Sequence, residues 1–126
     1  MMTQRFISAW CYEHEFSEKL GAIIYFENLE EKDLNEDNFT EEGCYITTPN
    51  KEYTVFDWTD VDGMIEDKMS EIQDSILDSL HNSELIKNYI NWDKYFDEHE
   101  INETDVLPSN CEKIEFYNNT YFIIEE

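Results

Sequence analysis

The sequence predicts an α+β fold in which a small antiparallel sheet packs with one long amphipathic helix and two shorter helices. Short β-branched and aromatic runs near both ends of the chain have the length and composition of strands. In the middle of the chain, apolar residues recur at the 3.6-residue spacing of a helix. A length of 126 residues suits one compact domain, with two small lobes at residues 1–60 and 61–126 as the alternative.

The first half of the chain is expected to supply four strands. Side chains alternate over residues 4–12, and the apolar run at residues 20–26 is short enough for a buried strand. Pro49-Asn50 has the chemistry of a turn, which predicts a hairpin between the next two runs. Residues 27–42 carry many acids and few core candidates, which predicts a solvated loop with one turn of helix. The four predicted strands span residues 4–12, 20–26, 43–48 and 52–58.

One long helix is expected over residues 63–80, with Asp62 as its N-cap. Apolar side chains share one face of it and are expected to be buried: Ile65, Met69, Ile72, Ile76 and Leu80. Carboxylates recur at the same spacing on a second face: Asp67, Glu71, Asp74 and Asp78. The rest of the prediction comprises short helices at residues 83–90 and 92–98 and a terminal hairpin of strands 113–117 and 120–124, with a tight turn at Asn118-Asn119.

The chain carries 31 acidic and 8 basic residues, so its formal net charge is -23. This charge would repel the phosphates of a nucleic acid and the surface of an anionic membrane. We therefore expect neither direct nucleic-acid binding nor membrane binding, and we expect a basic protein as the partner. Eight Tyr, eight Phe and three Trp supply the apolar surface that a core needs to offset the repulsion between like charges.

The sequence contains no recognisable secretory signal and no apolar run long enough to span a membrane. Its three cysteines, Cys11, Cys44 and Cys111, are odd in number and widely spaced, which favours reduced thiols over disulfides. These features together predict a cytoplasmic protein.

The sequence offers no convincing catalytic or metal site, so we expect neither an enzyme nor a cofactor. Residues 60–63 invite comparison with a calcium loop, but Trp58 and Met69 then stand where the first ligand and the bidentate Glu belong. Cys11 and His14 lack a second ligand pair at matching spacing. A nucleophile motif and a Gly-rich phosphate loop are also missing from the sequence.

The carboxylate face of the predicted helix is the candidate binding site. An exposed helix usually intersperses cations among its acids, whereas Lys68 is the only base in residues 63–80. Such a face can serve solubility alone, but the shortage of cations favours imitation of nucleic acid. The expected partner-binding residues are Asp67, Glu71, Asp74 and Asp78. A second group, in the acidic loop, is expected to assist them: Glu30, Glu31, Asp33, Glu36 and Asp37.

Residues 51–58, Lys-Glu-Tyr-Thr-Val-Phe-Asp-Trp, resemble the ArdA-type antirestriction proteins. In that family an acidic residue and an aromatic lead through an apolar stretch into an Asp–aromatic pair. Residues 5–26 are similar to the family's opening strand, Tyr-containing loop and second strand. Residues 89–96 resemble its Tyr-x-Asp-Tyr-x-x-(Tyr/Phe) segment, with Asn91 and Trp92 substituted.

The resemblance implies an acidic DNA mimic, without cofactor or catalytic residues, that occupies the DNA-binding groove of type I restriction–modification enzymes. A CRISPR–Cas effector is the second expected target, because its groove is also basic. The family's mimic is a dimer, so a homodimer is a further expectation. Such an antirestriction or anti-CRISPR inhibitor would come from a phage or mobile element and act in the cytoplasm of a bacterial host. The alternative is an immunity protein that neutralises a basic toxin such as a nuclease.

Overall fold

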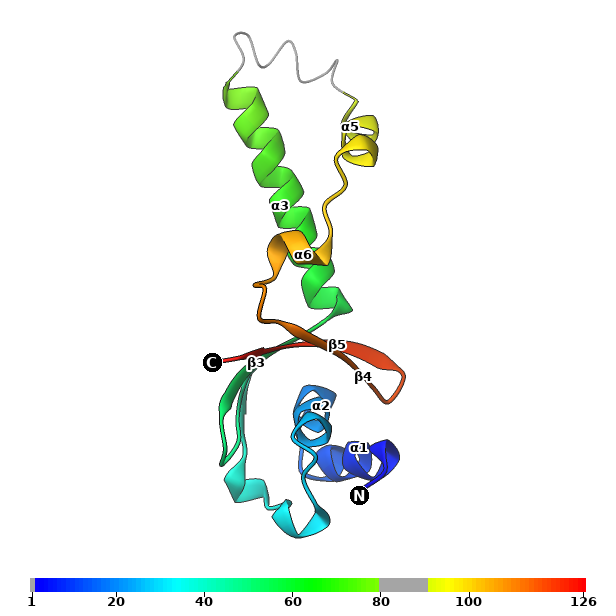
Figure 1. Cartoon of the computed structure of the whole chain (residues 1–126), viewed down its shortest axis with the longest axis vertical. Helices are drawn as coiled ribbons and strands as arrows, with labels where there is room; N and C mark the ends of the chain where they lie inside the picture. The colour runs from blue at the N-terminus through cyan, green and yellow to red at the C-terminus, as the bar shows by residue number, and fades with distance from the viewer. Residues whose placement is uncertain (1, 80–90) are drawn as a thin grey trace. The chain divides into compact units, whose positions relative to one another are not determined.

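The structure, a computed structural model, describes residues 2–79 and 91–126 (Figure 1). It divides into two compact units. The sheet unit comprises Met1–Thr59 and Pro108–Glu126, and the helical unit comprises Asp60–Leu107. The described residues contain both helices and an antiparallel sheet, so the predicted α+β class is confirmed.

The sheet unit contains a five-stranded antiparallel sheet in the order β1-β2-β3-β5-β4. β3 and β5 form its central pair, with Val55 opposite Ile123. The strands predicted near residues 43–48, 52–58, 113–117 and 120–124 are confirmed, whereas β1 lies in the segment predicted as a loop. The strands span Thr40–Glu42 (β1), Tyr45–Thr47 (β2), Glu52–Asp57 (β3), Glu112–Phe116 (β4) and Asn119–Glu125 (β5).

A two-residue turn closes the hairpin of β4 and β5. Its residues Tyr117 and Asn118 have φ angles of 47° and 68°, and the register pairs Phe116 with Asn119. Positive φ at both central residues is typical of a type I′ turn, whose twist matches that of the flanking strands. The predicted turn at Asn118-Asn119 is therefore wrong by one position, and Tyr117 occupies a place that favours Asn or Gly.

The strand predicted over residues 4–12 is wrong, because this segment forms helix α1, Gln4–Glu13. The Thr3 hydroxyl caps the helix by accepting a backbone amide hydrogen bond at 3.1 Å. Ile7 and Cys11, four residues apart, are its buried side chains. Burial therefore follows the helical period, and the alternation read from the sequence does not decide which side chains are buried.

The strand predicted over residues 20–26 is also wrong, because Glu18–Phe26 forms helix α2. The Ser17 hydroxyl is its N-cap and accepts a hydrogen bond from the Lys19 amide at 3.2 Å. Every residue from 20 to 24 is buried. A short apolar run that is buried on all sides has no visible period, so the sequence could not separate a helix from a buried strand.

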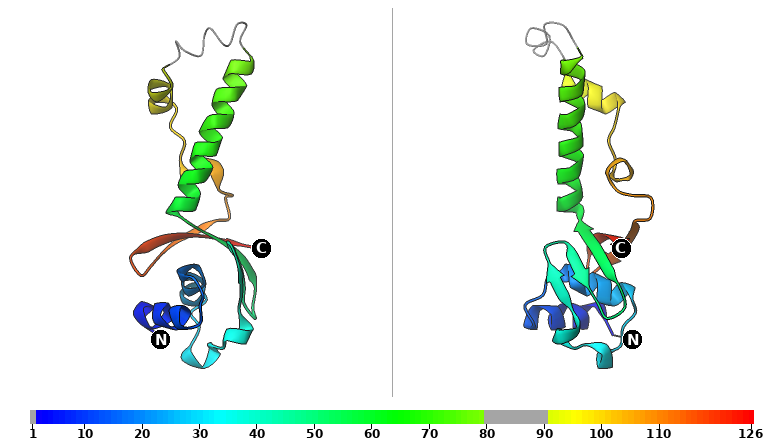
Figure 2. Two further views of the ribbon diagram at one scale, coloured as in Figure 1. Left: turned by 180° about the vertical axis from the view of Figure 1, so that it is seen from behind. Right: turned by 90° about the vertical axis from the view of Figure 1, so that its left-hand side faces the viewer.

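α1 and α2 lie on one face of the curved sheet, and their apolar side chains form the core of the sheet unit with those of the strands (Figures 1 and 2). Gly21 of α2 lies against β4, because a Cβ built on it would be 2.8 Å from the Phe116 ring. Phe116 is fully buried in the core. Gly21 therefore lets α2 approach the sheet closely. The buried core consists of Ile7, Cys11, Leu20, Ala22, Ile23, Ile24, Phe39, Ile46, Tyr53, Val55, Phe116, Tyr121 and Ile123.

The longest helix, α3 (Trp58–Asp78), enters the helical unit at Asp60. Among the described residues, two short helices follow it, α5 (Trp92–Glu98) and α6 (Glu103–Val106). α5 confirms the helix predicted at residues 92–98, whereas α6 was not predicted. The helix predicted at residues 83–90 lies outside the described residues, and so does Leu80.

α3 begins earlier than the predicted start at Gly63. β3 ends at Asp57 and Trp58 is the first helical residue, so the chain enters the helix without a loop. The Trp58 ring packs edge-on against Phe122 of β5, with ring centroids 4.9 Å apart. Asp62, the expected N-cap, therefore lies inside the helix and cannot cap it.

The apolar face of α3 is less buried than predicted. Val61 is fully buried. The apolar side chains that follow it are all of intermediate exposure: Ile65, Met69, Ile72, Ile76 and Leu77. The expected buried stripe is thus a partly covered face over the residues that the structure describes.

Alanine substitution is expected to have opposite effects at Gly21 and Gly63, the two helical glycines. Gly21→Ala would push a methyl group into the Phe116 ring and should lower the free energy of unfolding by about 1–3 kcal/mol. At Gly63 nothing lies within 4 Å of a built Cβ. Gly63→Ala should therefore raise the free energy of unfolding by about 0.5–1 kcal/mol, because Ala loses less backbone entropy in a helix. Urea denaturation of both variants measures the effects, and two changes of the same sign would contradict this packing.

Candidate functional site

α3 presents a row of carboxylates along one face. We call Asp67, Glu71, Asp74 and Asp78 the acidic stripe, and all four side chains are exposed. At a rise of about 1.5 Å per residue, the stripe extends about 16 Å along the helix axis. Within residues 2–79 and 91–126, none of the four forms a hydrogen bond or an ion pair. The predicted residues therefore share one exposed face, where a cationic partner can reach them.

One end of the acidic stripe borders a shallow hollow of about 320 Å³. α6 brings Asp105 there, beside the first two acids of the stripe, and Lys68 offsets part of the negative charge. No local sequence pattern indicates Asp105, because its place depends on how α6 packs on α3. The lining residues are Met64, Asp67, Lys68, Glu71, Asp105 and Val106.

The second predicted group of acids lies in two short 3-10 helices of the sheet unit, η1 (Glu31–Asp33) and η2 (Glu36–Asn38). Asp33 has a structural role, because its carboxylate accepts a hydrogen bond from the Glu30 amide at 3.0 Å in a capping box. Glu30 also pairs with Lys32 at 3.4 Å, but both side chains are exposed, so the pair adds little stability. The five predicted residues of this group are all exposed: Glu30, Glu31, Asp33, Glu36 and Asp37.

A second cleft of the helical unit, which we call the α5 cleft, was not predicted. Its volume is about 340 Å³. Trp92 and Phe96 are four residues apart on α5, and so are Asp93 and Asp97, so this helix supplies both apolar and acidic walls. That double spacing is the signal that sequence reasoning overlooked. The lining residues are Met69, Trp92, Asp93, Phe96, Asp97, Glu100 and Ile101.

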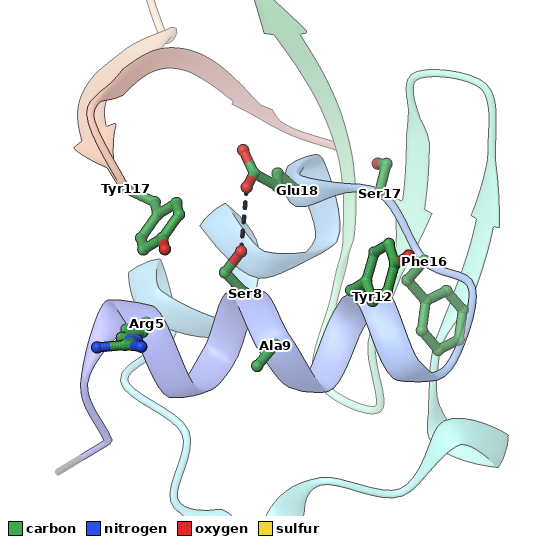
Figure 3. A pocket seen from close by; sticks show the side chains of 8 residues that line it. All are labelled: Arg5, Ser8, Ala9, Tyr12, Phe16, Ser17, Glu18 and Tyr117. Carbon is green, nitrogen blue, oxygen red and sulfur yellow. Dashed lines mark hydrogen bonds between the residues drawn. The ribbon is translucent and has the colours of Figure 1, made fainter.

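The sheet unit has a cleft of about 480 Å³ on α1, which we call the α1 cleft (Figure 3). Tyr12 and Tyr117 line it, and their side chains are 84% and 39% exposed. Figure 3 shows Glu18 between them, where the Ser8 hydroxyl donates a hydrogen bond to its carboxylate at 3.0 Å. Arg5 also lines the cleft, so it combines exposed aromatic rings with both signs of charge. The remaining lining residues are Ala9, Phe16 and Ser17.

Glu18 attaches the start of α2 to β5. Besides the bond from Ser8, its carboxylate accepts hydrogen bonds from the Asn119 amide group and the Tyr121 hydroxyl, both at 3.3 Å. Tyr121 is only 4% exposed. Desolvation raises the pKa of Tyr121 from 10.0 to about 12, and the charge and hydrogen bond of Glu18 raise it further in the same direction. Glu18 is therefore a structural acceptor as well as part of the α1 cleft.

Glu27 makes the matching connection at the end of α2. Its carboxylate accepts hydrogen bonds from the Tyr53 hydroxyl at 2.8 Å and the Thr48 hydroxyl at 3.0 Å. Desolvation raises the pKa of Tyr53 above its ordinary value, and the hydrogen bond and charge of Glu27 add to the shift. These contacts join α2 to β3 and to the β2–β3 hairpin, so Glu27 stabilises the fold.

The thiols and acids of the described residues do not form a metal centre. No group of three or more His, Cys, Asp or Glu in this part of the chain could hold a metal ion. Cys11, Cys44 and Cys111 form no disulfide. Burial, followed by the charges of Glu41 and Glu18, raises the pKa of Cys11 to about 12. Across the same residues, no helix is long and apolar enough to cross a membrane.

Comparison of the chain with protein-family models, with curated proteins and with solved structures finds no match. The resemblance to ArdA-type proteins at residues 51–58 therefore stays a prediction from short motifs.

Alkaline pH is expected to destabilise the sheet unit through Tyr53 and Tyr121. Both pKa values are raised above the ordinary value of 10.0, to about 12 for Tyr121. A raised pKa in the folded state contributes stability that is fully present below about pH 10 and is lost as the pH rises toward about 12. The urea midpoint should therefore fall over this range, and Tyr121→Phe should weaken that fall. The unsubstituted chain is the reference, and an equally steep fall in Tyr121→Phe would contradict the role of Tyr121.

Proposed function

We propose that this chain is an acidic DNA mimic that occupies the basic nucleic-acid-binding groove of a host defence complex in the bacterial cytoplasm. A type I restriction–modification enzyme is the first candidate target and a CRISPR–Cas effector the second. The acidic stripe carries the proposal, because its carboxylates are exposed and without partners among the described residues. The chain would inhibit its target without catalysis, by excluding DNA from the groove sterically and electrostatically.

The charge density along α3 supports the proposal. Seven acids lie between Asp60 and Asp78, and Lys68 is the only base in that span. With a rise of about 1.5 Å per residue, they occur about once every 4.5 Å along the helix axis, against one phosphate per ~3.4 Å along a DNA strand. The seven acids are Asp60, Asp62, Glu66, Asp67, Glu71, Asp74 and Asp78.

Electrostatics also favours a basic groove over other partners. Acids at i+3 and i+4 on one helix face repel each other, and water and salt only partly screen that repulsion. Binding in a groove lined with Lys and Arg relieves this repulsion. It also releases the ions bound to the groove, as the binding of DNA does. Binding should therefore weaken steeply as salt concentration rises.

Neutralising the acidic stripe tests the proposal. The stripe variant combines Asp67→Asn, Glu71→Gln, Asp74→Asn and Asp78→Asn. It should bind the target complex roughly 4- to 900-fold more weakly, because four surface charge contacts are lost at about 0.2–1 kcal/mol each. Biolayer interferometry at about 50 and 300 mM salt would measure the affinity, and DNA cleavage assays would measure inhibition.

A matched control removes the same charge from exposed acids of the sheet unit. It combines Glu→Gln changes at Glu13, Glu15, Glu112 and Glu115. This control should retain inhibition, since the acidic stripe is intact. Equal loss in both variants would mean that only the total charge matters, and binding that ignores salt would overturn the proposal.

The α1 cleft favours a second candidate function, an immunity protein that caps a basic toxin. Such interfaces depend on a few aromatic anchors more than on spread charge. Tyr12 is 84% exposed on α1, and Tyr117 faces the same cleft from the β4–β5 turn. Both rings are exposed where an anchor residue would contact a partner.

Tyr12→Ala separates the two functions, because the exposure of Tyr12 means that the change should not affect folding. A DNA mimic should keep its affinity within about twofold, whereas an immunity protein should lose roughly 30-fold or more, the effect of a hot spot. Tyr45→Ala is the control, since Tyr45 is an exposed tyrosine outside the α1 cleft. Loss of binding on Tyr12→Ala alone would favour the immunity function.

A further inference from the structure

The α5 cleft has an apolar interior. Phe96 is 9% exposed, and Met69, Trp92 and Ile101 are half-buried beside it. The Trp92 and Phe96 rings are stacked, with centroids 6.2 Å apart and an interplanar angle of 28°. The Asn91 side chain caps α5 by accepting a hydrogen bond from the Lys94 amide at 3.1 Å, which holds this turn of helix in place.

Carboxylates surround this apolar interior. Asp93, Asp97 and Glu100 line the α5 cleft and are exposed. No basic side chain lines it in the part of the chain that the structure describes. The other clefts differ in this respect, because Lys68 lines the hollow beside the acidic stripe and Arg5 lines the α1 cleft. The α5 cleft is therefore suited to accept a cation.

A long cationic side chain matches both halves of this lining. Its aliphatic stem would cover the apolar wall, while its charged end would reach the carboxylates. Arg fits better than Lys, because its planar guanidinium stacks on an indole ring and pairs with carboxylates through two hydrogen bonds. A volume of about 340 Å³ is near the lower end of ligand pockets, roughly 300–1,000 Å³, so one side chain suits it better than a cofactor.

We infer that the α5 cleft binds an arginine side chain of the basic partner. This inference rests on the proposed function, since it takes the same partner, and it adds a specific anchor to the general attraction of the acidic stripe. Spread charge mainly speeds association, whereas an anchor in a cleft mainly slows dissociation. The two surfaces thus have separable effects on binding kinetics.

Short peptides test the cleft without any knowledge of the partner. The probes are acetylated and amidated Gly-Gly-X-Gly-Gly peptides in which X is Arg, Lys or citrulline, which is neutral and close to Arg in shape. The readout is the indole N–H signal of Trp92 in the full chain, assigned among the three Trp signals by Trp92→Phe. The Arg peptide should shift this signal saturably at millimolar concentration, the Lys peptide should bind at least about threefold more weakly, and citrulline should have no effect. An unmoved Trp92 signal, or an equal response to citrulline, would overturn the inference.

Two triple variants with the same loss of charge locate the binding site. The cleft variant carries Asp93→Asn, Asp97→Asn and Glu100→Gln, and the comparison variant carries Glu71→Gln, Asp74→Asn and Asp78→Asn. The cleft variant should bind the Arg peptide at least about tenfold more weakly, while the comparison variant should keep the Trp92 response. Equal weakening in both would overturn the cleft as the site.

The same two variants separate this inference from the proposed function. If the comparison variant loses target inhibition and the cleft variant does not affect the dissociation rate, the DNA mimic stands and the arginine anchor falls. If the cleft variant alone loses both the peptide and the target, the anchor stands and mimicry by the acidic stripe falls. Far-UV circular dichroism of both variants confirms that α5 and α3 remain folded.

Discussion

With 31 acidic residues and 8 basic ones, most carboxylates in this chain must do without an ion pair. The sheet unit uses some of them as hydrogen-bond acceptors for neutral donors. Ser8 and Tyr121 donate to Glu18, Tyr53 and Thr48 donate to Glu27, and Ser17 donates to Glu41. A hydroxyl can satisfy a carboxylate without a countercharge. α2 is thereby attached at both ends, and the remaining acids can face water as a negative surface.

The sequence predicted the fold class better than the elements that build it. β3 and the terminal hairpin were recognisable because strand composition and turn chemistry are local. The alternating aromatic residues in the segment of α1 predict a strand, yet Tyr12 is exposed and Ile7 and Cys11 are buried at helical spacing. Thr3 and Ser17 are the local signals that favour helices here, since a Ser or Thr just before an apolar run is a candidate N-cap.

The candidate site was predictable only where a single helix builds it. The helical period alone places the four acids on one face of α3, and the structure agrees that the acidic stripe is exposed. Asp105 of α6 lies beside acids of α3, and Met69 of α3 lies beside aromatic residues of α5. Such contacts between helices depend on tertiary packing, which no local sequence pattern encodes. The sequence predicts that the acids of the loop form one binding group, but Asp33 also has a capping role in the structure.

Tyr117 combines a strained backbone with an exposed ring, and the two properties have opposing consequences. A tyrosine at a positive φ of 47° carries a conformational cost that Asn or Gly would largely avoid. Selection for thermal stability alone would therefore tend to replace it, and would strip one aromatic wall from the α1 cleft. Directed evolution of this chain for robustness should consequently change the α1 cleft first at the β4–β5 turn, so any function of that cleft has to be selected together with stability.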